Sequence, residues 1–246
     1  IAENFALTIS SASVGTIADA TGIGTIIDND ASTVTFGSAL LFDGTDDRIE
    51  ISDAANVSVT SNYTFEAWVY TTKALSEGAT TFQGVVSKGA YDYQFGLQDY
   101  AGADPTDHDV FFYEDQTGST TVLAASANVS ANAWKHIAIT NDSAQTLEYT
   151  IYLDGVAVSP SINMANVMVD GVANLVFGAT SNGSVYTDFF TGAIDDIRIW
   201  DEARTVSEIN ANKKVALRGD EEGLIGYWKL DNTLFDSAGL GSGDGV

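Results

Sequence analysis

The carboxylates of this chain are the side chains whose types and spacing offer the clearest chemistry. Residues 43–47 read DGTDD and place Asp43, Asp46 and Asp47 between two strand-like stretches. Because aspartate is a poor strand former, the cluster needs a reason. Three roles are open: catalysis by paired carboxylates, coordination of a cation, and an Asp-Gly turn whose side chains cap backbone N–H groups.

Three further segments are rich in carboxylate or amide oxygens. They read IDDIRIWDE, which contains Asp195 and Asp196, SKGAYDYQFGLQDYAGADPTDHD at residues 87–109, and GATSNGSVYTDF at residues 178–189. Hard cations such as Ca²⁺ take about six to eight oxygen ligands from carboxylates, amides and carbonyl groups. Since no strict ligand spacing such as that of the EF-hand loop is present, calcium coordination and plain turns both stay open as interpretations.

The charge balance narrows the choice of partners. The chain has 34 acidic and 10 basic residues, a net charge of -24 and a pI near 4.1. A surface this negative repels nucleic acids and anionic membranes, whereas it attracts divalent cations. The absence of cysteine excludes thiolate-based zinc and redox sites. The opening IAENF lacks the features of a signal peptide, and no apolar stretch is long enough to span a bilayer, so we expect a piece of a longer chain with no membrane insertion.

Strands are predicted to position the acidic segments, because apolar and polar residues alternate through most of the chain. In YTFEAWVY, the side chains of Phe65, Ala67 and Val69 share one face of the predicted strand. LEYTIYLDGVAV alternates in the same way and contains Asp154-Gly155, a dipeptide that suits a tight hairpin turn. Many short strands with regular turn signals indicate a sandwich or jelly roll.

One segment departs from this strand pattern, and another stands apart from the main domain. ARTVSEINANKKVAL predicts a helix, because Thr205 and Glu208 have capping-box spacing and two lysines lie toward its C-terminal end. Residues 1–32 read as two strands that end in the acidic run Asp28-Asn29-Asp30. Because an isolated hairpin is marginally stable, we expect this segment to pack on the following domain, to pair with another chain, or to be the remnant of a preceding domain.

From residue 34 to residue 240, the chain resembles the LamG-like jelly-roll family of the concanavalin A-like lectin/glucanase superfamily. The most specific piece is FTGAIDDIRIWDEARTVSEI, a final core strand followed by a capped helix. The other pieces, in the order of the family, are ALLFDGTDDRIEI, YTFEAWVY, VVSKG, WKHIAITND, TIYLDGVAV, LVFGA and GLIGYWKLDN. The resemblance implies an all-β fold for residues 33–246, a two-sheet antiparallel jelly-roll sandwich with one short helix in its C-terminal half.

Residues 1–32 resemble the tail of a Calx-beta-like repeat, which often closes with a GTI strand and an acidic run, here GTIIDND. Such repeats adjoin LamG-like modules in very large secreted bacterial adhesins of the RTX type. This resemblance implies an extracellular location at a bacterial cell surface, with flanking domains of the same long chain as neighbours.

The resemblance also bears on catalysis. Glucanases of this superfamily carry an E-x-D-x-x-E strand motif that is missing from this chain. Glu66 is a lone strand carboxylate, and His136 lies where the family usually has a histidine, so that a packed structural role is implied. His108, in DPTDHD, is expected to be a solvated loop histidine. Since nucleophile-elbow and phosphate-binding motifs are absent too, we expect no enzymatic activity.

Calcium-binding residues are implied by the pentraxins, similar modules that hold calcium for ligand binding with oxygens from the 87–109 and 178–189 regions. The corresponding residues here are Asp92 in the first region and Asn182 and Asp188 in the second. The acidic triplet expected in the second region is replaced by Ala179-Thr180-Ser181. Acidic residues of the longer first region could compensate: Asp99, Asp104, Asp107 and Asp109. A second, structural calcium could be shared by Asp43 and Asp196, because the family brings its N-terminal and C-terminal strands together.

Saccharide binding is the functional expectation. A calcium ion at a loop rim can bind vicinal hydroxyls, and an aromatic face can stack on a sugar ring. The ligand-binding candidates are Asp92, Tyr93, Gln94, Asp99, Tyr100, Asn182, Tyr186 and Asp188; the tyrosines among them could instead only pack locally. The tryptophans are expected to be structural.

The sequence thus predicts a non-catalytic, calcium-dependent carbohydrate-binding module of a bacterial surface adhesin, which attaches to glycans of a host or neighbouring cell. The alternative is a structural or protein-interaction module of an extracellular protein, in which calcium only makes the fold rigid.

Overall fold

The structure of this chain is a computed structural model that describes residues 2–8, 21–27, 38–53, 59, 61–73, 81–89, 92–99, 107–116, 119–143, 148–159, 162–163, 171–231, 234 and 236–238. The chain divides into two compact units, Ile1–Phe36 and Gly37–Val246. In the first unit, β1 (Ala2–Thr8) and β2 (Thr21–Ile27) pair as an antiparallel hairpin with Ala2 opposite Ile27. The predicted boundary after residue 32 falls close to this division, and the origin of the hairpin in a Calx-beta-like repeat stays a prediction. Asp28 and Asp30 lie outside the described residues.

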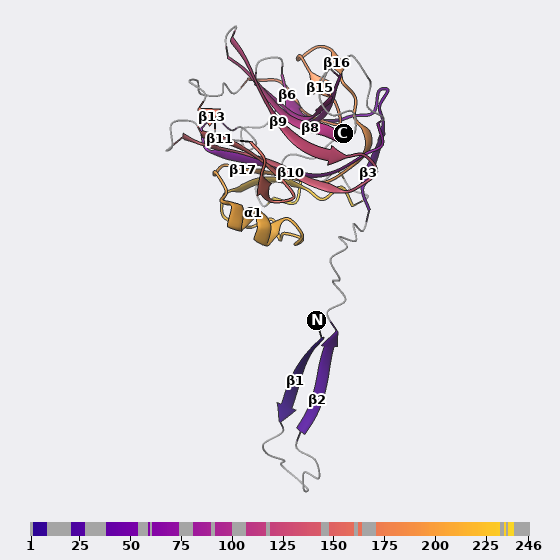
Figure 1. The fold of residues 1–246 in the computed structure, drawn as a ribbon, viewed down its shortest axis with the longest axis vertical. Coiled ribbons are helices and arrows are strands. Elements are labelled where there is room, and N and C mark those ends of the chain that lie inside the picture. Colours follow the sequence, from indigo (N-terminus) through magenta and orange to yellow (C-terminus); the bar gives the residue numbers. More distant parts are fainter. Residues whose placement is uncertain are drawn as a thin grey trace. The chain divides into compact units, whose positions relative to one another are not determined.

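The second unit is a sandwich of two antiparallel sheets (Figure 1). One sheet has eight strands in the order β12-β11-β10-β5-β17-β18, with β13 beside β11 and β3 beside β17. Its strands are β3 (Leu40–Asp43), β5 (Tyr63–Thr71), β10 (Lys135–Asp142), β11 (Glu148–Leu153), β12 (Val156–Ala157), β13 (Ile162–Asn163), β17 (Thr191–Trp200) and β18 (Leu224–Trp228). The predicted all-β jelly-roll class is confirmed.

The other sheet has six strands in the order β4-β14-β6-β7-β8-β9. They are β4 (Ile49–Ile51), β6 (Thr81–Lys88), β7 (Tyr93–Asp99), β8 (Asp107–Gln116), β9 (Ser119–Ser130) and β14 (Leu175–Phe177). A separate two-stranded hairpin, β15 (Thr180–Ser181) with β16 (Tyr186–Thr187), lies against β6 and on the outer side of this sheet in Figure 1.

The core lies between the two sheets and follows the alternation of the sequence. Phe65, Ala67 and Val69 share one face of β5 as predicted, and the structure shows that this face points into the core. The ring of Phe65 lies 4.6 Å from that of Tyr93 on β7. Burial of such side chains, at about 25 cal/mol per Å² of apolar surface, is the main stabilising contribution to the sandwich. The Asp154-Gly155 turn between β11 and β12 has φ values of 52° and 78°, as expected for a type I′ hairpin turn.

The single helix of the described residues, α1 (Val206–Asn212), covers the outer face of the eight-stranded sheet (Figure 1). The predicted capping box is present, since the Thr205 hydroxyl accepts from the Glu208 N–H and the Glu208 carboxylate accepts from the Thr205 N–H. The helix buries Ile209 against Ala138 and Tyr152. None of the helical segments that the structure describes combines the length and apolarity needed to cross a membrane.

A layer of buried charge lies between this sheet and the 202–213 segment. The carboxylate of Glu66 is fully buried, with His136 Nε2 at 3.1 Å and Arg204 Nε at 3.9 Å. His136 therefore has the packed structural role that was predicted. The full burial of Glu66 agrees with a structural role for its carboxylate.

Candidate ligand-binding site

A pocket of about 370 Å³ opens at the edge of the six-stranded sheet and is lined by Arg48, Glu50, Ser52 and Asn174. The alternation of β4 explains this lining. Ile49 and Ile51 point into the core, so that the intervening Glu50 and the flanking Arg48 and Ser52 face outward. β4 pairs with β14, and Asn174 directly precedes β14.

The polar groups of the pocket are bonded to one another. Arg48 Nε donates to Glu50 Oε1 at 2.8 Å, and Arg48 Nη1 donates to the Asp46 carbonyl oxygen at 3.3 Å. Asn174 Nδ2 donates to Glu50 Oε2 at 3.5 Å. These bonds hold the planar guanidinium, carboxylate and amide groups in defined orientations, as a preorganised binding site requires.

Tyr186 of β16 completes one wall beside the pocket. The Arg48 guanidinium carbon lies 4.0 Å from the centre of its ring, a cation–π arrangement. A hydrogen bond from Tyr186 lowers the pKa of the Glu50 carboxyl, and the same bond raises the pKa of the Tyr186 hydroxyl. Tyr186 was predicted as a ligand-binding residue, and the structure places it next to this pocket.

The hairpin that carries Tyr186 is held on the outer face of the sheet through β6. Ser87 Oγ donates to the Ala179 carbonyl oxygen at 2.9 Å, and the Gly84 N–H donates to the Asp188 carbonyl oxygen at 2.8 Å. Gly84 has no side chain, and the backbone of Ala179 occupies the space that a Cβ atom there would need. Close backbone approach at Gly84 therefore sets the position of the β15–β16 hairpin.

Gly84→Val is expected to displace this hairpin, because its side chain would overlap the Ala179 and Thr180 backbone. We expect a loss of about 1–3 kcal/mol in the free energy of unfolding, as for other overpacked sites, measured by urea denaturation. Ser130→Val is the matched control, since Ser130 is an exposed residue at the end of β9 in the same sheet. Equal stability of the two variants would contradict the close packing of the hairpin on β6.

The side chains of Asn182 and Asp188 form hydrogen bonds within this hairpin and stabilise it. Asn182 Oδ1 accepts from the N–H groups of Ser184 and Val185, at 3.0 and 2.8 Å. Asp188 Oδ2 accepts from the hydroxyls of Thr180 and Thr187, at 2.7 and 3.0 Å. Both predicted ligand residues thus lie close to Tyr186 in the chain, with their oxygens bonded within the hairpin itself.

The predicted residues at and just before the start of β7 lie on different faces of the six-stranded sheet. Asp92 is 5% exposed, and a Cβ atom on Gly171 would lie 2.5 Å from its Oδ1, so Asp92 is packed against the segment that leads to Asn174. Gln94 Nε2 donates to the Ser181 carbonyl oxygen at 3.4 Å, on the outer face of the sheet. Tyr93 points the other way, into the core, and is 2% exposed, so its ring is not available at the surface.

Other predicted residues lie at the far end of the sheet. β7 extends over seven residues, so Asp92 and Asp99 are roughly 20 Å apart. The Asp99 carboxylate contacts His108 Nδ1 and accepts from Thr81 Oγ1 at 2.7 Å. Asp109, on β8 opposite Gln98, is 9% exposed. These two aspartates therefore do not join Asp92 and Tyr186 in one site.

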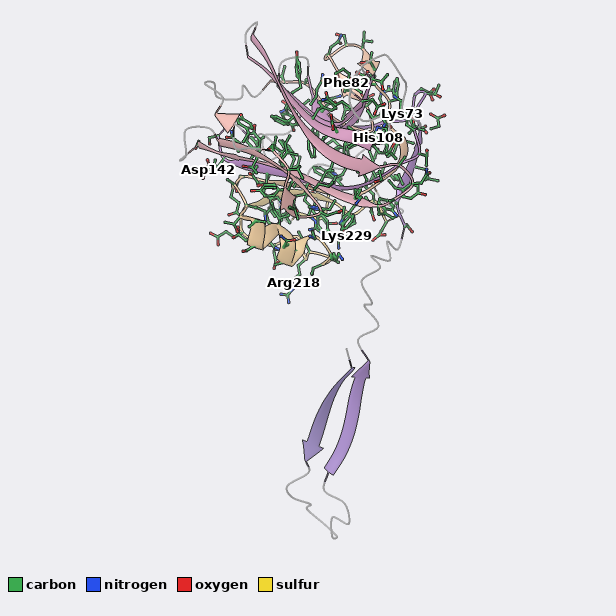
Figure 2. All side chains as sticks on the ribbon, viewed as in Figure 1. Lys73, Phe82, His108, Asp142, Arg218 and Lys229 are labelled. Atoms are coloured by element: carbon green, nitrogen blue, oxygen red, sulfur yellow. The ribbon has the colours of Figure 1, made fainter. Side chains whose placement is uncertain are left out.

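His108 corrects a prediction. It was expected to be a solvated loop histidine, but it belongs to β8 and is fully buried, with Nε2 3.3 Å from the Lys73 carbonyl oxygen. Figure 2 shows Lys73, Phe82 and His108 close together at this end of the sandwich. Strand pairing of β8 with β7 and β9 draws the residue inward. Tyr100, Asp104 and the side chain of Asp107 lie outside the described residues.

The DGTDD segment forms a turn that borders the pocket. Asp43 Oδ1 accepts from the Thr45 N–H at 2.7 Å, and Asp47 Oδ2 accepts from the Asp43 N–H at 2.9 Å. Oxygens of Asp43, Asp46 and Asp47 also lie within 4.8 Å of one another, a donor set that suits a hard cation. The side chains therefore cap the turn, and their spacing is compatible with a cation as well.

Asp196 does not share this location. In the β3–β17 ladder, Asp43 is opposite Thr191, and Leu40 at the other end of β3 is opposite Ile194. Asp196 lies five residues beyond Thr191, a span of roughly 16 Å along a strand. Its carboxylate accepts from the Tyr227 hydroxyl at 2.8 Å and from Arg198 at 3.3 Å. A single calcium ion shared by Asp43 and Asp196 does not fit this geometry.

Sequence reasoning missed all four residues that line the pocket, Arg48, Glu50, Ser52 and Asn174. RIEI signals that Arg48 and Glu50 share a strand face, but alternating charges on a strand are equally typical of a solvated face. The pocket forms only through contacts between distant parts of the sequence, since Asn174 and Tyr186 lie more than 120 residues after Arg48 and Glu50.

Comparisons with known proteins agree with the observed architecture. A profile of the concanavalin A-like lectin/glucanases superfamily matches residues 43–210. Among curated protein sequences, none matches the chain.

Solved structures share the fold at low sequence identity. A candidate carbohydrate-binding protein from Bacteroides ovatus aligns with a TM-score of 0.68 and 18% identity, over 100% of this chain and 66% of that protein. A heptameric pentraxin from Limulus polyphemus aligns with a TM-score of 0.54 and 13% identity, over 69% of this chain and 78% of the pentraxin. The CBM40 module of a Ruminococcus gnavus sialidase, bound to α2,3-sialyllactose, aligns with a TM-score of 0.54 and 19% identity, over 71% of this chain and 95% of the module.

Proposed function

This chain belongs to the concanavalin A-like lectin/glucanases superfamily, and we propose that it is a non-catalytic saccharide-binding module whose ligand enters the pocket of Arg48, Glu50, Ser52 and Asn174. One observation carries the proposal: the pocket is a concave site in which several hydrogen-bonding groups converge beside an aromatic ring. Similar folds in a CBM40 module that binds sialyllactose, and in a candidate carbohydrate-binding protein, support the same class of ligand.

The chemistry of the pocket suits a sugar. A saccharide hydroxyl both donates and accepts hydrogen bonds. Arg48 supplies donors, Glu50 supplies acceptors, and the amide of Asn174 supplies both. The Tyr186 ring beside them offers an apolar surface for C–H groups of a sugar ring. These are the few polar groups and the apolar surface that fix a small ligand in a preformed site.

The same composition supports binding rather than hydrolysis. Glycosidases use two carboxyl groups about 5–10 Å apart, one as an acid and the other as nucleophile or base. Among the described residues, the pocket lining contains one carboxylate, Glu50, and both of its oxygens are hydrogen bonded to neighbouring side chains. A second acid positioned across the pocket would be needed for catalysis.

Calcium is the second part of the proposal. The turn of Asp43, Asp46 and Asp47 would hold the ion through its carboxylates and make rigid the segment from which Arg48 projects. We further propose an extracellular module of a bacterial adhesin that binds glycans of a host or neighbouring cell, with residues 1–32 leading to a flanking domain of the same chain.

Arg48→Ala is expected to weaken saccharide binding at least tenfold, since a charged donor contributes about 1.5–3 kcal/mol to a hydrogen bond. Binding is measured by glycan array, followed by isothermal titration of the best ligand with calcium and with EDTA. Arg218→Ala is the matched control, because Arg218 is exposed on the α1 side of the sandwich (Figure 2). Absence of binding to any glycan would defeat the proposal. If EDTA then still lowered the melting temperature, the chain would be a structural module made rigid by calcium.

A further inference from the structure

We infer that the pocket selects neutral saccharides and discriminates against sugars that carry a carboxylate, such as uronic and sialic acids. The inference rests on the proposed function, because it names the class of saccharide that the same pocket accepts. It separates this chain from the similar CBM40 module, which is bound to a sialylated sugar.

The first argument is the charge within the pocket. Arg48 is the one cationic residue in its lining, and its Nε is bonded to Glu50 at 2.8 Å. Its Nη1 is bonded to the Asp46 carbonyl oxygen, and one face of the guanidinium is turned to the ring of Tyr186. The lining among the described residues is therefore neutral as a whole. Each edge of the guanidinium that could bind a carboxylate as a bidentate pair has one nitrogen already bonded, Nε to Glu50 and Nη1 to the Asp46 carbonyl oxygen.

The second argument is the surroundings of the pocket. The DGTDD turn places three exposed carboxylates, those of Asp43, Asp46 and Asp47, beside Arg48. A bound calcium ion would offset two of these three charges and leave the turn negative. An incoming carboxylate therefore meets repulsion from the turn as well as from Glu50.

The third argument is where the other cations lie. Lys88 lies on β6 opposite Leu175 of β14, is 1% exposed and pairs with Asp53 at 2.9 Å. Lys73 lies at the far end of the sheet, and Figure 2 shows Arg218 and Lys229 on the α1 side of the sandwich. The remaining basic residues belong to the eight-stranded sheet or to the segments just before and just after α1: Lys135, Arg198, Arg204, Lys213 and Lys214. In a chain of net charge -24, no second cation is thus available to an acidic sugar at this pocket among the residues described.

The hydrogen-bonding pattern points the same way. A carboxylate only accepts hydrogen bonds, so it cannot bond with the acceptor oxygens of Glu50. Hydroxyl groups of a neutral sugar can donate to Glu50 and accept from Asn174 and Arg48 without breaking the Arg48–Glu50 pair. The rival arrangement, in which a sugar carboxylate displaces Glu50 from Arg48, leaves Glu50 without its cationic partner next to the acidic turn.

The test uses pairs of a neutral and an acidic ligand, on a glycan array and by isothermal titration. Galactotriose and trigalacturonic acid differ in their carboxylates at equal length, and α2,3-sialyllactose differs from lactose by one sialic acid residue. We expect the neutral member of any pair that binds to bind at least tenfold more tightly, and the ratio to shrink as salt screens the charges. Glu50→Gln is expected to lower the ratio of neutral to acidic affinity at least fivefold. Because this readout is a ratio within one variant, a change in the fraction of folded protein does not affect it.

Two results would overturn the inference. Equal or tighter binding of the acidic members would refute the selectivity while leaving saccharide binding in place. Binding of no saccharide, neutral or acidic, would refute the proposed function and the selectivity together.

Discussion

Glu66→Ala is expected to lower the free energy of unfolding by about 3–5 kcal/mol, the cost of removing one partner from a buried ion pair. Glu66 is fully buried on β5, with His136 at 3.1 Å and Arg204 at 3.9 Å, and Trp68 packs against the His136 ring. Removal of its carboxylate leaves the Arg204 charge, which is 6% exposed, with less compensation inside the protein. Urea denaturation of the purified domain measures the change.

Electrostatics within this cluster explain why the group is charged. Burial alone would raise the pKa of Glu66, but the hydrogen bond and charge of His136, together with the charges of Arg198 and Arg204, outweigh it and lower the pKa. The carboxylate therefore contributes stability above the pKa of an unfolded glutamate, and this contribution is lost as the pH falls through the lower pKa of the folded state.

Glu202→Ala is the matched control for this prediction. Glu202 pairs with the same arginine, at 3.2 Å, but its side chain is 41% exposed. Exposed ion pairs contribute about 0–1 kcal/mol, so this variant should unfold at nearly the same urea concentration as the parent. Similar losses in the two variants would show that burial does not set the value of the pair, and would contradict the prediction.

The fold of this chain was largely predictable because it rests on local patterns. The alternation in YTFEAWVY identified the residues that share one face of β5, and the spacing of Thr205 and Glu208 identified the start of α1. The Asp154-Gly155 dipeptide identified a hairpin turn whose positive φ values suit those two residues. Each signal lies within a few residues of the structure that it specifies.

The site was less predictable because it depends on distant segments. Asp92 and Asp99 lie in one stretch of sequence, yet β7 carries them to opposite ends of a sheet. His108 sits among loop-forming residues, but pairing with β7 and β9 buries it. Arg48, Asn174 and Tyr186 come together only when β4, β14 and the β15–β16 hairpin are in place. No local pattern in the sequence predicts that these three residues lie close together.

Asp195 is the opposite case to Glu66. Asp195 is a buried carboxyl group whose neighbours do not offset the cost of burying its charge. It lies on β17 opposite Trp68, is 3% exposed, and accepts a hydrogen bond from the Asp196 N–H at 3.0 Å. Burial, and then the charge of Asp196, raise the pKa of Asp195 to about 8. The folded protein therefore holds a proton at Asp195 at neutral pH, where an unfolded aspartate has lost it.

This pKa fixes the sign of the pH dependence. An unfolded aspartate titrates near 3.8, so between that pH and about pH 8 the folded state binds one more proton than the unfolded state. The contribution of Asp195 to stability is therefore most favourable below this window, falls as the pH rises through it, and is constant above about pH 8. The unmodified protein should therefore lose stability between pH 3.8 and about pH 8 because of Asp195, and a substitution that removes this carboxyl group should abolish that loss.

Asp195→Asn is expected to raise the free energy of unfolding by about 2–3 kcal/mol at pH 8, after allowance for relaxation around the ionised group. The melting temperature should rise by about 5–10 °C at pH 8 and by much less at pH 5, where Asp195 is already protonated. Thermal unfolding in EDTA, so that no bound cation keeps the carboxylate ionised, measures both values. Asp201→Asn, at an exposed position just after β17, is the control and should give little change at either pH. An equal gain for Asp195→Asn at the two pH values would mean that packing rather than ionisation limits stability at this position.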